Sequence, residues 1–168
     1  MPKIIENLES RLIDAAGSQL ARSGYASVTI RSVAQAVGVG VGTVYNYFPS
    51  KDALIAGFLL RDWNVRLSAI RELSLRSDSP EPVACFIHGQ LREFSVRHQS
   101  IFGDPEAAVA YAGSFGRYHG MLRSQIAEPL RKFCSSDFSA EFIAESLLTW
   151  TIGGKPFSDI YGMIQKLF

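Results

Sequence analysis

Two short apolar-patterned stretches on either side of a glycine run constrain this chain more than any other feature. They lie in the segment 29–51, which reads TIRSVAQAVGVGVGTVYNYFPSK. Apolar residues in its first half follow the i, i+3, i+4, i+7 spacing that lines one face of a helix: Ile30, Val33, Ala34 and Val37. A glycine-containing run, Gly38-Val39-Gly40, interrupts this pattern, and a second short helix over about 41–48 must end before Pro49. The segment therefore predicts two short helices joined by a tight turn.

The other segments also have helical periodicity, so the expected fold class is all-α. Apolar stripes predict helices over about 5–20, 50–76, 82–98 and 140–152 and a final helix after Pro156. They also predict a long helical region over about 105–133, either continuous or interrupted near Gly113–Gly116. No stretch alternates apolar and polar residues with the period of a strand. We expect a three-helix N-terminal helix-turn-helix domain over residues 1–50 and a small helical bundle over residues 51–168.

Packing the apolar side of the helix pair inward exposes a defined set of residues on the second helix. That outward face is Val41, Gly42, Thr43, Tyr45, Asn46 and Tyr47. Asparagine can pair with adenine in the major groove, threonine can contact a base, and tyrosine hydroxyls can reach phosphates. Arg31 is suited to reading guanine, and Lys51 can meet a phosphate beside a helix N-terminus. The residues alone leave open a surface helix pair that binds no ligand.

Charge and composition do not decide between these interpretations. The formal net charge of the 168 residues is only +1, so there is no strongly basic domain to attract nucleic acid broadly. An apolar fraction of 47% is enough for a folded core. The two cysteines, Cys85 and Cys134, are expected to be free thiols in a reducing, cytoplasmic location without membrane association.

Signatures of catalysis are missing from the sequence, so we expect neither an enzyme nor a cofactor. The chain has no phosphate-binding glycine loop, nucleophile elbow or paired-histidine motif. The glycines at 38–42 lack the GxGxxG spacing and the preceding strand of a nucleotide-binding loop. Cys85 and His88 share a helical face but have no clear third partner, so no metal site is expected.

The block 12–54 resembles the N-terminal domain of the TetR/AcrR family of bacterial regulators. It opens with LIDAAGSQLARSGYASVTIRSVAQAVG and closes with VGVGTVYNYFPSKDALI, in register and without a gap. The resemblance implies phosphate contacts for Thr29, Tyr45, Tyr47 and Lys51 and base contacts for Arg31, Val41, Thr43 and Asn46. Val41 departs from the polar residue common in the family, and Gly40 replaces a capping serine.

The resemblance also implies a role for the C-terminal body. It implies a homodimer that binds double-stranded DNA through the N-terminal domain and contacts its second copy through the last two helices. Ile143, Leu147 and Trp150 are the expected seam. An apolar or aromatic small-molecule effector is expected to contact residues with apolar faces and polar handles: Trp63, Phe86, Phe94, Tyr111, Phe115, Tyr118, His119 and Leu122.

The predicted function is sequence-specific transcriptional regulation. We expect a repressor that an effector releases from a pseudo-palindromic operator. The alternative is a helical ligand-binding or protein-interaction module that has lost DNA binding, which the near-neutral charge and Val41 keep open.

Overall fold

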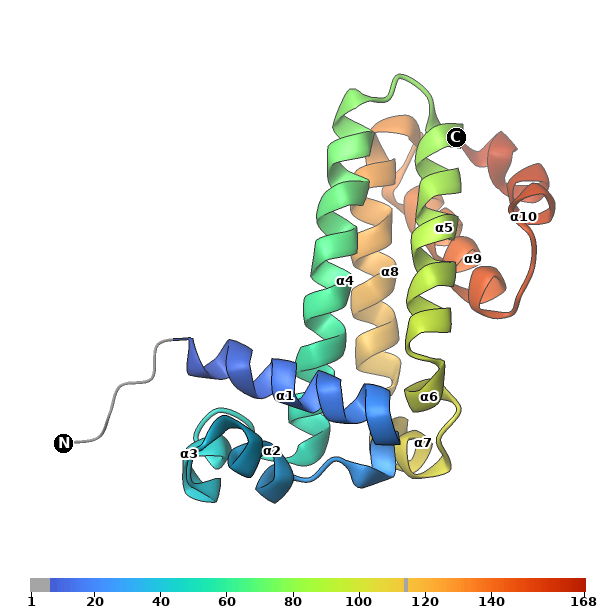
Figure 1. Ribbon diagram of the computed structural model, residues 1–168. Coiled ribbons are helices and arrows are strands. Elements are labelled where there is room, and N and C mark those ends of the chain that lie inside the picture. The colour runs from blue at the N-terminus through green and yellow to red at the C-terminus, as the bar shows by residue number, and fades with distance from the viewer. Residues whose placement is uncertain (1–6, 114) are drawn as a thin grey trace. The chain divides into compact units, whose positions relative to one another are not determined.

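The computed structural model describes residues 7–113 and 115–168 and is helical almost throughout (Figure 1). No β-strand occurs within these ranges, which confirms the all-α prediction. The described residues divide into two compact units: 7–62 with 98–112, and 63–97 with 113 and 115–168. Helix α4 (Lys51–Arg76) contributes to both units. None of the described helices combines the length and apolar character needed to cross a bilayer.

The first unit contains the predicted helix-turn-helix. Its elements are α1 (Leu8–Ser23), the 3₁₀ turn η1 (Tyr25–Ser27), α2 (Ile30–Val37), α3 (Val41–Tyr45), the start of α4, α6 (Gln99–Phe102) and α7 (Pro105–Ala112). Leu12, Val33 and Val44 are fully buried where α1, α2 and α3 meet. Ile101 of α6 and Ala107 of α7 belong to the same core. This unit is therefore larger than the predicted domain 1–50, whose boundary at the start of α4 stays a prediction.

The turn between α2 and α3 forms as the sequence predicts. Thr29 accepts a hydrogen bond from the Ser32 backbone N–H at 3.0 Å, and the Ser32 hydroxyl accepts one from the Thr29 N–H at 3.1 Å. This reciprocal capping box fixes the start of α2. Gly38 ends the helix with φ of 76°, a left-handed conformation that glycine adopts without a Cβ penalty.

The second unit is a helical bundle in which α9 is central. Its elements are the remainder of α4, α5 (Pro80–Arg97), α8 (Phe115–Leu130), η2 (Arg131–Phe133), α9 (Asp137–Ile152), α10 (Phe157–Ile164) and η3 (Gln165–Leu167). Helix α9 packs against α5, α8 and α10. Ile143 and Leu147, expected in a dimer seam, are wholly buried in this core because they face the neighbouring helices of their own chain. Of the expected seam residues, Trp150 is the one that is exposed.

Candidate nucleic-acid interface

Helix α3 has a buried inner side that fixes which residues face outward. Val44 is fully buried and Phe48, just beyond the helix, is nearly so. Val41, Tyr45 and Tyr47 keep 37%, 52% and 46% of their surface exposed. Gly42 and Asn46 are also exposed, and Thr43 is half-buried. The residues of the predicted outward face are thus presented together by a short helix held from behind.

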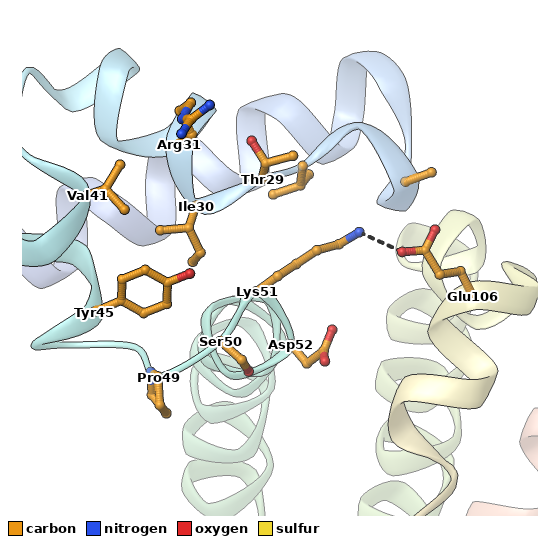
Figure 2. Close-up of a pocket in the computed structure, with 12 residues that line it drawn as sticks. Thr29, Ile30, Arg31, Val41, Tyr45, Pro49, Ser50, Lys51, Asp52 and Glu106 are labelled. Carbon is orange, nitrogen blue, oxygen red and sulfur yellow. Dashed lines mark hydrogen bonds and ion pairs between the residues drawn. The ribbon is translucent and has the colours of Figure 1, made fainter.

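A pocket of about 660 Å³ opens beside this helix and collects five of the nine predicted DNA-contacting residues. These five are Thr29, Arg31, Val41, Tyr45 and Lys51. Figure 2 shows Tyr45 and Val41 on one side, Arg31 and Thr29 above, and Lys51 extending across the opening from α4. The other four predicted residues, Gly42, Thr43, Asn46 and Tyr47, lie on α3 or directly after it.

Lys51 is held in place by two partners that the sequence did not reveal. Its Nζ lies 3.2 Å from Oε1 of Glu106 on α7 (Figure 2). The same ammonium lies over the ring of Tyr25, 3.9 Å from the ring centroid, which is a cation–π arrangement. A side chain predicted to grip a phosphate therefore has an acidic partner and an aromatic platform.

Asp52, next to Lys51 in the first turn of α4, organises the elements around it. Its carboxylate accepts a hydrogen bond from the Tyr25 hydroxyl, and its backbone carbonyl accepts one from the Tyr111 hydroxyl at 2.9 Å. Burial raises the pKa of Tyr25 far above its ordinary value, and the hydrogen bond to Asp52 raises it further. The phenol therefore remains a neutral donor. These bonds connect η1, α4 and α7 within the first unit.

Seven of the twelve residues that line the pocket were not predicted, and Asp52 and Glu106 are the two acidic ones among them. Glu106 is 55 residues from Lys51 along the chain, and no local pattern relates them.

Tyr111 was expected to contact an effector in the body. It lies in the first unit, beside Tyr25, with ring centroids 6.4 Å apart.

Most of the predicted effector residues lie in the second unit. Trp63 is buried, donates a hydrogen bond from Nε1 to Gln125 at 2.8 Å, and meets the edge of Phe94 at 5.7 Å between ring centroids. Phe86 and Leu122 are partly buried against the same core. Tyr118 and His119 are half-buried on α8. Phe115 begins α8, but its side chain lies outside the described part of the chain.

His119 is part of a polar cluster between α8 and α9. Its Nε2 lies 2.9 Å from the carboxylate of Glu145, which also accepts a hydrogen bond from the Thr149 hydroxyl. Partial burial raises the pKa of Glu145, but the bonds from His119 and Thr149 and the charge of Arg123 outweigh it. The net result is a pKa below the usual glutamate value.

Large apolar side chains on α9 remain exposed opposite its buried side. Phe138, Phe142 and Trp150 keep 78%, 50% and 53% of their surface accessible. Ile152 at the end of α9 and Met163 on α10 are exposed as well. Phe138 and Phe142 lie next to each other, with ring centroids 6.4 Å apart, so these two rings form a continuous exposed apolar surface.

The N-terminal segment matches a known family. The family described as bacterial regulatory proteins, tetR family, matches residues 12–57. The HTH-type transcriptional repressor KstR of Rhodococcus jostii is 42% identical over 53 residues, which is 32% of this chain and 25% of the relative. KstR of Mycolicibacterium smegmatis is 32% identical over 88 residues, 52% of this chain and 43% of the relative. The chain thus spans less than half the length of these relatives.

Solved structures extend the likeness of fold to the whole chain. The TetR family repressor AlkX from a Dietzia strain, implicated in biodegradation of n-alkanes, has a TM-score of 0.68 and 19% identity, and the match covers 94% of this chain and 97% of AlkX. FadR of Thermus thermophilus, a TetR family repressor solved with lauroyl-CoA, has a TM-score of 0.65 and 22% identity over 95% and 92% of the two chains. At these identities the likeness shows the fold alone: a helix-turn-helix domain followed by a helical bundle.

Proposed function

Residues 12–57 belong to the tetR family of bacterial regulatory proteins, and from this premise we propose that the chain is a sequence-specific DNA-binding transcriptional regulator. The observation that carries the proposal is the exposed face of α3, fixed from behind by buried Val44 and flanked by Arg31 and Lys51 at one pocket. The face carries no charged residue, so its chemistry suits base edges better than bulk solvent.

Each proposed contact follows from side-chain chemistry and position. Arg31 is exposed at the start of α2 and can donate a bidentate pair of hydrogen bonds to guanine. Thr43 and Asn46 are proposed to read bases, together with an apolar contact from Val41. Thr29, Tyr45, Tyr47 and Lys51 are proposed to hold phosphates. A Cβ built on Gly42 meets nothing within 4 Å, so its backbone is open to close approach by a duplex.

A homodimer through α9 and α10 completes the proposal. Two recognition helices about 34–36 Å apart, one turn of B-DNA, match two half-sites of a pseudo-palindrome. The exposed apolar face of α9, with Phe138, Phe142 and Trp150, supports an interface between copies of this chain.

Repression relieved by an effector is the regulatory part of the proposal. We place an apolar or aromatic effector in the second unit near Trp63, Phe94 and Leu122, which combine apolar surface with the polar handle of Gln125. An effector that prefers one conformation of the body shifts the equilibrium only by its difference in affinity for the two states.

The test is a gel-shift assay with genomic fragments from around the gene of this protein at low salt. The wild type is expected to retard at least one fragment. Lys51→Ala is expected to weaken binding to all fragments alike and to reduce the salt slope by about one unit, because one phosphate contact is lost. If no fragment is retarded even at low salt, the chain is instead a helical binding module without DNA-binding function.

A further inference from the structure

The pocket beside α3 contains the carboxylate of Glu106 next to the ammonium of Lys51. Glu106 reaches Lys51 at 3.2 Å, while its own side chain keeps 63% of its surface exposed. The Lys51 side chain is only 20% exposed and rests over the Tyr25 ring. The ammonium therefore has the Tyr25 ring on one side and the exposed Glu106 carboxylate as its ion-pair partner.

The position of Glu106 is built into α7. The Asp104 side chain accepts hydrogen bonds from the backbone N–H groups of Glu106 and Ala107 at 2.8 and 3.1 Å, which caps the start of the helix. Ala107 is buried in the first core, and Tyr111, one turn further along α7, bonds to the Asp52 carbonyl. The cap and the burial of Ala107 fix the start of α7, and the Tyr111 bond connects this helix to the first turn of α4.

A carboxylate at this place opposes the binding of DNA. A phosphate that approaches Lys51 must displace the Glu106 carboxylate from the ammonium. The displaced carboxylate stays nearby, and its negative charge repels the phosphate. Asp52 is a second acid at the pocket, but the Tyr25 hydroxyl already donates a hydrogen bond to it. Glu106 is therefore the acid that competes directly for Lys51.

We propose that Glu106 is an affinity-determining residue of the nucleic-acid interface, a built-in competitor that lowers the affinity of Lys51 for a DNA phosphate. The proposal rests on the DNA-binding function proposed above. Because the competition concerns the backbone of DNA, it applies to any duplex sequence and does not require the operator to be known. Glu106 accordingly tunes affinity and leaves base preference unchanged.

The test is the binding of a fluorescein-labelled 30-base-pair duplex of random sequence, followed by anisotropy at 50 mM salt. Glu106→Gln is expected to lower the Kd about two- to fivefold, the range that corresponds to exposed ion pairs. Screening should reduce this gain at higher salt. Glu81→Gln makes the same charge change at an exposed position in the first turn of α5, in the second unit, and is expected to leave the Kd unchanged. Glu106→Ala serves as a second variant, and thermal melts check folding.

A double-mutant cycle with Lys51→Ala decides whether Glu106 acts through Lys51. The gain from Glu106→Gln should appear with Lys51 present and largely disappear in the Lys51→Ala background. An unchanged Kd, or an equal gain in both backgrounds, would overturn the proposal while leaving DNA binding intact. Failure of the wild type to bind any duplex would instead overturn the proposed function and this inference together.

Discussion

Arg31 is the residue on which base discrimination is expected to depend most. Arg31→Ala should relax preference at one operator position by about 1–3 kcal/mol, because a bidentate pair with guanine is lost. Arg31→Lys keeps the charge without the planar fork and should restore little of the discrimination. Competition binding with operators substituted at each position measures the base preference of the wild type and of both variants. An equal loss of affinity across all sequences would assign Arg31 to the phosphate backbone.

The ring of Phe58 leaves no room for a side chain at Gly17. A Cβ built on Gly17 would lie 2.5 Å from Cε2 of the Phe58 ring, which itself packs edge-on against His98 at 5.4 Å between centroids. We expect Gly17→Ala to destabilise the first unit by about 1–3 kcal/mol through overpacking. The control is Gly89→Ala in α5, where a Cβ meets nothing within 4 Å. That change should be neutral or stabilising, since alanine favours helix. Equal melting temperatures for both variants would contradict the packing argument.

At the residue scale, the sequence predicts what local spacing determines. The inward Val44 and outward Tyr45 follow from helical periodicity together with the glycine turn, and both lie as predicted. The pairing of Lys51 with Glu106 does not follow, because it depends on which distant helix packs against the start of α4. Ile143 and Leu147 show the same limit: an apolar stripe predicts burial but does not say whether the covering surface belongs to the same chain.

Thr29, at the N-terminus of α2, stabilises the helix as its cap and is also proposed to contact DNA. These two roles can be separated experimentally. The Thr29 hydroxyl oxygen accepts the Ser32 N–H bond that caps the helix, and Thr29 also lines the pocket at which we propose phosphate contact. Thr29→Ala should cost about 0.5–2 kcal/mol of stability through loss of the cap. Thr29→Asp retains a good cap and should preserve stability while weakening DNA binding by charge repulsion. Denaturation curves and duplex binding of both variants distinguish the roles, and unimpaired binding by Thr29→Asp would remove Thr29 from the interface.

Helix α7 shows why the extent of the first unit could not be predicted from sequence. The sequence predicts a helical region from Pro105 to about residue 133, in which the structure has two separate helices, α7 and α8, and contiguous reading assigns everything after residue 50 to the body. The structure packs Ala107 and Tyr111 with the helix-turn-helix instead. This placement arises from side chains far apart in sequence, such as Tyr111 with the Asp52 carbonyl, and long-range contacts of this kind leave no periodic signal.

At the scale of the whole molecule, the proposed function requires two copies of the chain. A single chain presents one recognition helix and few phosphate contacts, and its net charge of +1 adds little general attraction to DNA. A dimer doubles the contacts and fixes the spacing of the two half-sites. In such a dimer, the exposed apolar side of α9 is the surface that we expect the second copy of the chain to cover.

Phe142→Asp tests this requirement, since it places a charge on the exposed apolar side of α9. We expect the variant to fold and to sediment as a monomer, because Phe142 is half exposed in the chain but would be desolvated in the dimer. Its binding to a full pseudo-palindrome should fall to the level of a single half-site. Leu75→Asp is the matched control: Leu75, on α4, is 83% exposed, and the variant should remain dimeric. Sedimentation velocity and titration with full and half operators provide the measurements. A dimeric Phe142→Asp with full operator affinity would move the subunit interface away from α9, whereas a monomeric wild type that binds its operator would remove the need for a dimer.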